Sequence, residues 1–394
     1  MEWKEYNICQ LCDTISETYK GKSNSVVLIN TSDVLEGKVL NHKRVPNKGL
    51  KGQFKKTFKK NDILYSEIRP ANKRFAYINF SPNDYIASTK LMVLRSKPIV
   101  SSYFLFQILK SEIVLKNLQM LAESRSGTFP QITYSELSNV RVKVPPLPVQ
   151  DKIVGILSAL DSKIENNNKI NANLEAQAQA LFKSWFVDFT PFKDQPFVDS
   201  ELGPIPQGWK VGKLGDIALQ STEKVLTRND VKVLSPITTG KLVLSEEYFT
   251  KQVFSKSIRN YKIVKQGAFA YNPARVNIGS LGMNEFKFDG CVSPVYVVFE
   301  CLKGYSFFFD LFRKTEFFKQ AVISFAIGGV RQTLNYSDFA LIDVTIPPLN
   351  IVQSFNEIYL HLKKKISINE EENQRLAALR DTLLPKLMSG EIKL

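Results

Sequence analysis

Two long segments of the chain place apolar residues in a stripe with alternating steps of three and four residues, the pattern of one helix packed against another. Both stripes are apolar at their ends and polar in the middle. The polar middles face each other only if the helices run antiparallel. We therefore predict an intramolecular antiparallel coiled coil in which Asn167 and Asn171 meet Lys365, Asn369 and Glu372. The alternative is that each helix docks separately on a globular domain. The first stripe is Leu157, Leu160, Ile164, Asn167, Asn171, Leu174 and Leu181, and the second is Phe355, Ile358, Leu362, Asn369, Leu376 and Leu383.

Both helices carry the same start signal. Pro-Pro-Leu stands directly before each stripe, at residues 145–147 and 347–349. Proline is tolerated before and at the first helical turn, so each helix should begin at this motif. Gly390 should end the second helix, and Pro385 should break or kink its last turn.

The Pro-Pro-Leu motif belongs to a tandem repeat with an offset of 202 residues. Residues 134–137 (YSEL) return at that offset as 336–339 (YSDF), and the offset continues into the two long helices. Towards the N-terminal side it drifts by a few residues, as insertions in loops would cause. The plan of the chain is therefore a head, a helix, a second head and a second helix.

The two heads mix strands with helices. Short alternating runs at 61–68, 90–96 and 291–300 predict strands, and residues 101–123 and 304–324 predict helices packed on them. We expect an α+β fold, with two mixed α/β heads in tandem and two long helices that form the antiparallel coiled coil with pseudo-two-fold symmetry. The predicted boundaries are 1–148 for the first head, 149–186 for the first long helix, 187–205 for a linker, 206–350 for the second head and 351–390 for the second long helix.

An excess of basic residues indicates a polyanionic partner. The chain has 53 Lys and Arg against 38 Asp and Glu, a formal net charge of +15. Residues 41–61 contain eight Lys or Arg and no acid, interleaved with Phe54 and Phe58. Cations laid on phosphates release counterions, so nucleic acid is favoured over a membrane surface, for which the sequence offers no basic amphipathic helix. For residues 41–61 alone, the alternative is a solvated basic loop.

Catalytic motifs are absent from the sequence. It has neither a G-x-x-x-x-G-K-[ST] loop nor a G-x-G-x-x-G turn, and its only histidines are His42 and His361. Cys9 and Cys12 have C-x-x-C spacing, but no histidine completes a set of four ligands, so we predict no metal site. The sequence indicates binding without catalysis. Without a signal peptide or a sufficiently long apolar run, we expect an intracellular, soluble protein.

The order of heads and helices resembles that of the specificity subunits of type I restriction–modification systems. The resemblance covers the whole chain, is specific in the helices and their flanks, and is weak inside the heads. It is carried by SGTFPQITYSEL (126–137), the run 144–189, DSELGPIPQGW (199–209) and RLAALRDTLLPKLMSGEI (375–392). The second head departs from the first here, with GGVRQTLNYS (328–337) in place of SGTFPQITYS.

This resemblance implies that each head is a target recognition domain for one half of a bipartite, asymmetric site in double-stranded DNA. The helices would set the gap between the half-sites and dock two methyltransferase (modification) subunits. Motor–nuclease (restriction) subunits would join the complex. S-adenosylmethionine, ATP and Mg would belong to those partners, with no cofactor on this chain, and the complex would be cytoplasmic.

Side chains that bond bidentately to guanine or adenine edges are the candidates for base contact. We expect about half of the candidates to touch DNA and fewer to touch bases, because most protein–DNA hydrogen bonds go to the backbone. The alternative for each is a surface side chain that contacts phosphate or nothing. The candidates are Arg69, Asn72, Lys73, Arg74, Arg125, Thr128 and Gln131 in the first head, and Arg275, Asn277, Arg331 and Gln332 in the second.

Two other classes of protein compete with this interpretation. One is a non-catalytic coiled-coil adaptor that presents two protein-binding modules, and the other is an enzyme whose catalytic half lies elsewhere. The net charge and the unlike heads favour DNA over the adaptor. The missing cofactor and metal motifs count against the enzyme.

Overall fold

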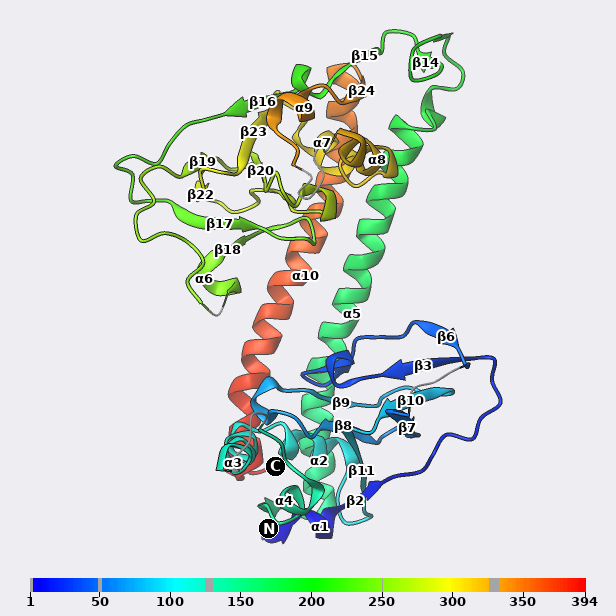
Figure 1. Cartoon of the computed structure of the whole chain (residues 1–394), viewed down its shortest axis with the longest axis vertical. Coiled ribbons are helices and arrows are strands. Elements are labelled where there is room, and N and C mark those ends of the chain that lie inside the picture. The colour runs from blue at the N-terminus through cyan, green and yellow to red at the C-terminus, as the bar shows by residue number, and fades with distance from the viewer. Residues whose placement is uncertain (1–2, 49–51, 125–129, 250, 326–332) are drawn as a thin grey trace. The chain divides into compact units, whose positions relative to one another are not determined.

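The computed structural model describes residues 3–48, 52–124, 130–249, 251–325 and 333–394. It divides into two compact units, each built from one head and from parts of both long helices (Figure 1). Unit 1 comprises Met1–Asn166 with Glu372–Leu394, and unit 2 comprises Asn167–Glu371. Over these described ranges, none of the helices has the length and apolar character needed to cross a membrane.

The first head is built on two four-stranded sheets in the order β6-β3-β10-β7 and β2-β11-β8-β9. β3 and β10 pair in parallel, whereas the second sheet is antiparallel. The antiparallel pair β1-β12 joins the beginning of the head to its end, with Lys4 opposite Val144. The strands are β1 Lys4–Asn7, β2 Cys12–Ile15, β3 Ser25–Ile29, β4 Val34–Leu35, β5 Lys38–Val39, β6 Arg44–Pro46, β7 Phe54–Lys56, β8 Ile63–Ser66, β9 Phe75–Tyr77, β10 Tyr85–Ser88, β11 Leu91–Ser96 and β12 Arg141–Val144.

The second head repeats this plan. Its sheets have the order β18-β17-β22-β19 and β16-β23-β20-β21, its parallel pair is β17-β22, and β15 pairs with β24. The predicted strand 291–300 is two strands, β22 and β23, separated by a turn. The linker forms the short pair β13-β14. The strands are β13 Phe197–Val198, β14 Ile205–Pro206, β15 Lys210–Lys213, β16 Ala218–Ser221, β17 Lys232–Pro236, β18 Leu242–Leu244, β19 Lys262–Val264, β20 Phe269–Tyr271, β21 Leu281–Met283, β22 Gly290–Val292, β23 Val297–Cys301 and β24 Asp343–Ile346.

A repeated tyrosine has the same role in both heads. Tyr134 Oη donates to the carbonyl of Cys12 over 2.6 Å, and Tyr336 Oη donates to the carbonyl of Ala218 over 2.7 Å. Each bond ties a short helix to the first strand of the corresponding sheet. The sequence repeat is therefore also a repeat of the fold, in strand order and in contacts.

Each helix predicted for a head proves to be two helices. The breaks fall at Ser111 and Thr315, whose hydroxyls accept from the backbone N–H groups of Val114 (3.4 Å) and Phe318 (3.3 Å) and so cap the second helix. The expectation of one continuous helix missed this capping signal. The head helices are α1 Ile8–Leu11, α2 Ser102–Leu109, α3 Glu112–Ser124, α4 Tyr134–Ser138, α6 Ser245–Tyr248, α7 Ser306–Phe312, α8 Glu316–Phe325 and α9 Tyr336–Ala340; the 3-10 turns are η1 Thr31–Asp33, η2 Pro70–Asn72, η3 Thr190–Phe192, η4 Leu214–Asp216 and η5 Val276–Ile278.

The two long helices are α5 (Leu147–Phe186) and α10 (Leu349–Ser389). In unit 1 Arg380 of α10 pairs with Asp161 of α5, and in unit 2 Asn369 of α10 donates to Asn171 of α5 over 2.7 Å. A second contact in each unit, Lys163 with Glu372 in unit 1 and Phe182 with Phe355 in unit 2, shows that the partner's number falls along α10 as the number rises along α5. The antiparallel coiled coil is confirmed, with paired asparagines at its polar centre.

The stripe on α10 alternates between two heptad positions, and at the one that contains Ile358 the buried residue is the next one along the chain. Ile358 is 42% exposed, whereas its neighbour Tyr359 is 5% exposed and packs in the core of unit 2. Phe355, Leu362, Asn369, Leu376 and Leu383 keep buried or half-buried positions, as predicted. The sequence fits two orders of steps equally well: three then four, from Phe355 through Ile358 to Leu362, or four then three, through Tyr359. The packing of the Tyr359 ring in the core selects the second order.

The ends of the helices follow the proline and glycine signals. α5 and α10 begin at Leu147 and Leu349, directly after Pro-Pro, and Gly390, with φ of +77°, follows the end of α10. Pro385 does not break α10, which continues through it to Ser389. A proline in the last turn removes one hydrogen bond, and the packing of Leu387 in the core of unit 1 holds that turn in place.

Candidate nucleic-acid interface

Four candidates of the first head, Arg69, Asn72, Lys73 and Arg74, lie on the turn between β8 and β9. Arg69 and Lys73 flank η2 and adopt left-handed backbone conformations, with φ of 44° and 53°. Such conformations cost on the order of 1–3 kcal/mol each for residues other than glycine, and they persist only where surrounding contacts impose them. The turn is therefore held in one shape by the rest of the head.

Three contacts impose that shape. The backbone N–H of Ala71 donates to Gln119 Oε1 of α3 over 3.0 Å. The N–H of Arg69 donates to the carbonyl of Pro130 over 3.0 Å, and Ile68 forms an antiparallel bridge with Gln131. Since Gln131 also accepts from Lys90 Nζ at 3.3 Å, the structure brings Arg69, Gln131 and a lysine not predicted from the sequence to one place.

The candidates on this turn differ in how they are used. Lys73 Nζ lies 3.4 Å from Glu112 and 3.8 Å from Glu36, and the guanidinium of Arg74 donates to the carbonyls of Ser32 and Val34. These two cations hold the turn against neighbouring segments. Arg69 and Asn72 are more exposed than Lys73 and Arg74, so their side chains are the more accessible to a ligand.

Two candidates of the second head, Arg275 and Asn277, lie on the corresponding turn, between β20 and β21. Arg275 and Asn277 are exposed on η5. The turn ends at Gly279, with φ of +93°, and a Cβ at that position would lie 2.6 Å from the carbonyl oxygen of Thr238. Ser280 Oγ donates to the carbonyl of Pro236 over 2.8 Å and anchors the exit of the turn. The same point of the same sheet thus presents unlike side chains in the two heads. Arg125, Thr128, Arg331 and Gln332 lie outside the described residues.

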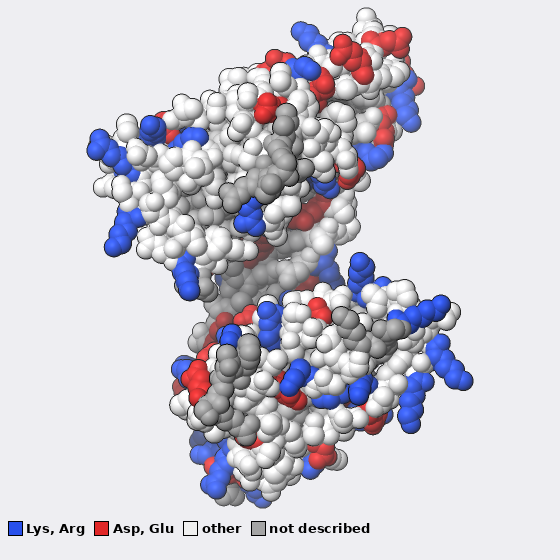
Figure 2. All heavy atoms as spheres, viewed as in Figure 1, with Lys and Arg blue, Asp and Glu red and all other residues white. Residues whose placement is uncertain are grey.

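The basic segment 41–61 contributes β6 and β7, the two opposite edge strands of one sheet of the first head, and Lys and Arg side chains project from this region (Figure 2). Lys43, Arg44, Lys55 and Lys59 are exposed. Lys56 instead points inward and donates to the carbonyls of Thr89 and Leu91, and burial lowers the pKa of its ammonium group. The segment therefore places exposed cations at both edges of this sheet.

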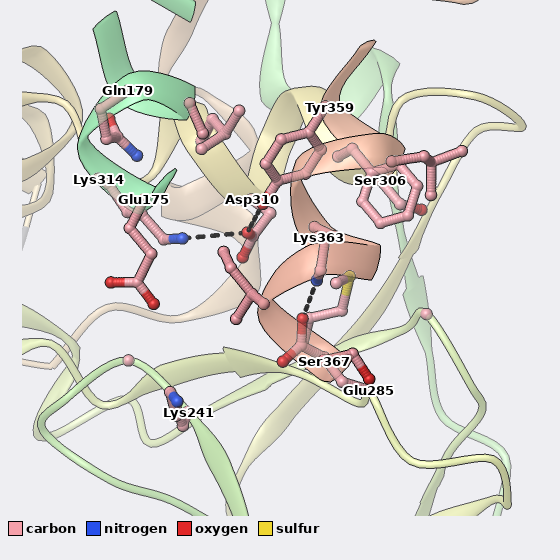
Figure 3. Close-up of a pocket in the computed structure, with 18 of the residues that line it drawn as sticks. Glu175, Gln179, Lys241, Glu285, Ser306, Asp310, Lys314, Tyr359, Lys363 and Ser367 are labelled. Carbon is pink, nitrogen blue, oxygen red and sulfur yellow. Dashed lines mark hydrogen bonds and ion pairs between the residues drawn. The ribbon is translucent and has the colours of Figure 1, made fainter. Parts of the chain in front are cut away.

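Unit 2 also contains a cavity of about 1060 Å³ between the second head and the two long helices (Figure 3). Asp310 of α7 is buried there and binds Arg313 at 2.6 Å and Lys314 at 3.1 Å, while Tyr359 Oη donates to it over 3.2 Å. Burial alone would raise the pKa of the Asp310 carboxyl. The positive charges of Arg313, Lys314 and Lys363 together lower it by more than that, so its pKa lies well below its usual range. The sequence analysis missed this cluster, although a lone acid within the apolar run SFFFDLF was a visible signal.

Comparison with known proteins gives a consistent result. Residues 1–176 match the family model described as type I restriction modification DNA specificity domain. The type I restriction enzyme HindI specificity subunit of Haemophilus influenzae is 30% identical over 463 residues, covering 99% of this chain and 100% of that protein. The MjaIX specificity subunit of Methanocaldococcus jannaschii is 28% identical over 367 residues, covering 89% of this chain and 82% of that protein.

A solved structure shares the fold. The S subunit of a type I restriction–modification system from M. genitalium has a TM-score of 0.55 and 16% identity, over 98% of this chain and 96% of that one. Two heads of one topology, with unlike exposed turns and an antiparallel helix pair, define a two-headed recognition protein. The chain belongs to the family of type I restriction enzyme specificity subunits.

Proposed function

We propose that this chain is the DNA-reading subunit of a type I restriction–modification complex, in which each head reads one half of a bipartite, asymmetric site. The observation that carries the proposal is the pair of corresponding turns, 67–74 and 272–280, which occupy the same point of the same sheet and present different side chains. Two readers of different sequences need a common scaffold and unlike contact residues. In this scheme the length of the two long helices sets the gap between the half-sites.

Base reading falls to the exposed members of these turns. Arg69 and Asn72 in the first head, and Arg275 and Asn277 in the second, can bond bidentately to guanine or adenine edges. The exposed cations in and beside β6 and β7, Lys43, Arg44, Lys55 and Lys59, neutralise phosphates and hold the duplex without sequence preference. Lys73 and Arg74 act indirectly, by keeping the first turn in shape.

The helix pair docks two copies of a modification subunit. Matching positions on the two helices carry exposed apolar side chains: Leu147 and Leu349 are 41% and 43% exposed, and Ile156 and Ile358 are 36% and 42% exposed. Exposed apolar side chains at corresponding positions of the two helices suit two identical partners. Restriction subunits join this assembly in the cytoplasm. S-adenosylmethionine, ATP and Mg belong to the partner subunits, and this chain supplies recognition without catalysis.

Co-expression with the modification subunits, followed by sequencing of methylated bases, tests the proposal. The wild-type chain should produce one bipartite methylation motif. Arg275→Ala should relax the motif in one half only, by about 1–3 kcal/mol of discrimination at one position. Lys303→Ala, an exposed residue outside the turn, is the matched control and should leave both halves unchanged. Relaxation of both halves together, or a motif without a gap, would contradict two independent readers.

Salt dependence tests the electrostatic part separately. DNA affinity of the assembled complex should fall steeply as salt rises, because each neutralised phosphate releases counterions. Replacing Lys43, Lys55 and Lys59 by Gln should weaken binding to all sequences alike and make the salt dependence shallower by as much as about one counterion per lysine that contacts a phosphate. An unchanged slope would remove β6 and β7 from the interface.

A further inference from the structure

In unit 1 a tyrosine–carboxylate hydrogen bond ties the head to the helix pair. Tyr103 of α2 donates its hydroxyl to Asp161 of α5. Arg380 of α10 binds the other oxygen of the same carboxylate at 2.9 Å. One acid thus joins three elements, and both the head and the second helix are oriented against the first helix at this point.

In unit 2 the same kind of bond has the opposite placement. The carboxylate, Asp310, is on the head helix α7, and the tyrosine, Tyr359, is on α10 (Figure 3). Arg313 and Lys314 of the head form ion pairs with this carboxylate. Arg313 also donates to the carbonyls of Leu281 and Gly240, at 2.9 and 3.0 Å. Asp310 is 4% exposed, so its orientation is fixed by these partners.

The helix residues at the two junctions correspond through the tandem repeat. At the offset of 202, Leu157 corresponds to Tyr359, Asp161 to Lys363, and Ala178 to Arg380. The first junction therefore uses the set Leu157, Asp161 and Arg380, and the second uses Tyr359, Lys363 and Ala178. Each set lies against its own head, and the members of the second set line the cavity of unit 2.

The two sets are chemically incompatible with the other head. Beside the first set, Asp310 would face Leu157 in place of the tyrosine hydroxyl and the acid Asp161 in place of Lys363. Arg380, in place of Ala178, is already bound to the carboxylate of Asp161. A buried carboxylate that loses a donor and gains a like charge is strongly disfavoured. Lys363 is itself tied to the second head, since it forms an ion pair with Glu285 and lies 5.5 Å from the ring of Phe307.

We propose that the two sets of helix residues are positioning residues. They hold each head at a fixed orientation on the helix pair and match each head to its own half of that pair. The matching of each head to its half of the helix pair is inferred from the contacts alone. The further inference that the fixed orientation of the heads sets the distance between half-sites rests on the function proposed above. A pairing rule of this kind acts through groups that reject the wrong partner as well as groups that bind the right one.

A crossed experiment on full-length chains tests the matching. In one chimaera the first head is replaced by a second copy of residues 206–346, on the unchanged first set. In its twin the first set also carries Leu157→Tyr, Asp161→Lys and Arg380→Ala. The twin should unfold at a midpoint higher by on the order of 5 °C. The same three substitutions in the native chain should lower its midpoint. Equal behaviour of the two chimaeras, whether both fold or neither does, would overturn the matching.

A second experiment tests positioning in the complex with modification subunits. Tyr103→Phe and Tyr359→Phe each remove one hydroxyl that ties a head to its helix. Methylation at sites whose gap is one base pair longer or shorter should rise severalfold relative to sites with the native gap, with both half-sites unchanged. Tyr248→Phe, at an exposed tyrosine, is the control. A uniform loss at every gap length would show a merely structural role and overturn the proposal. If the wild type yields no bipartite motif, the proposed function fails, and the crossed stability experiment still decides the matching.

Discussion

At Gly279 the turn that carries Arg275 and Asn277 closes against a neighbouring backbone. The residue combines a left-handed φ of +93° with a gap too small for a Cβ, which would lie 2.6 Å from the carbonyl oxygen of Thr238. The positive φ would strain the backbone of any other residue, and the nearby carbonyl oxygen of Thr238 would clash with its Cβ. Both fix the direction in which the exposed side chains of η5 leave the sheet.

Gly279→Ala should therefore destabilise unit 2 by about 2 kcal/mol or more and alter recognition of one half-site. Gly203→Ala is a matched control, because Gly203 has φ of +94° but no atom within 4 Å of the place that a Cβ would occupy. The control should cost only the strain, about 1 kcal/mol. Urea unfolding of both variants measures the difference, and equal costs would show that the contact with Thr238 is easily relieved.

Asp310 gives a prediction about pH. Its pKa in the folded protein lies below the ordinary value of 3.8, so its ion pairs contribute stability that is fully present above about pH 4 and is lost as pH falls towards the folded-state pKa. Asp310→Asn should cost about 3 kcal/mol at pH 7, because Arg313 would remain buried without its partner. The cost should shrink below pH 4. Unfolding curves at pH 7 and pH 3.5 check this, and a pH-independent difference would assign the loss to packing.

At the scale of elements, the pattern of apolar residues predicted more than the chemistry of single residues did. The long helices, their antiparallel pairing and their starts at Pro-Pro-Leu follow from periodicity and proline geometry, which are local properties. The choice between Ile358 and Tyr359 for the stripe is not local, because it depends on which side chain fills the space beside Phe307 and Phe355. Tertiary packing decides between two equally good local patterns.

The candidate site was predictable by residue type and not by role. The sequence singled out the turn of the first head by its Arg, Asn and Lys content, yet Lys73 and Arg74 bind groups of the protein itself. Whether a basic side chain is used internally depends on acids and carbonyls brought close by the fold, such as Glu112 from α3. For the same reason the link between Lys90 and Gln131 could not be predicted from a single sequence.

The asparagine pair at the centre of the helices should lower the stability of the helix pair and, in return, fix the register of the two helices. Asn171→Leu alone leaves the buried amide of Asn369 without its partner and should cost about 1–3 kcal/mol. Replacing both by Leu should recover that loss or stabilise the chain, since apolar residues pack well in a coiled coil, while weakening the choice of register. Asn173→Leu, at an exposed position of α5, is the control. A double-mutant cycle by chemical unfolding gives the coupling, and additive effects of the two substitutions would show that the pair is not coupled.

At the scale of the whole molecule, the proposed function makes the length of the helix pair the determinant of the gap between the half-sites. α5 and α10 are continuous over 40 and 41 residues, and each rises about 1.5 Å per residue. Seven residues therefore correspond to about 10.5 Å, or about three base pairs at ~3.4 Å each. A heptad also preserves the stripe, so its removal leaves the facing side chains in phase.

Deleting residues 164–170 from α5 together with 370–376 from α10 should shorten the recognised gap by about three base pairs. This choice keeps the bond between Asn171 and Asn369 and the pair between Asp161 and Arg380, which lie on either side of the deleted turns. Sequencing of methylated bases from cells that co-express the modification subunits gives the gap directly. Deleting only one of the two segments puts the helices out of register and should abolish methylation. A shortened helix pair that still methylates at the original gap would mean that the partner subunits, and not the length of the helices, determine the spacing of the half-sites.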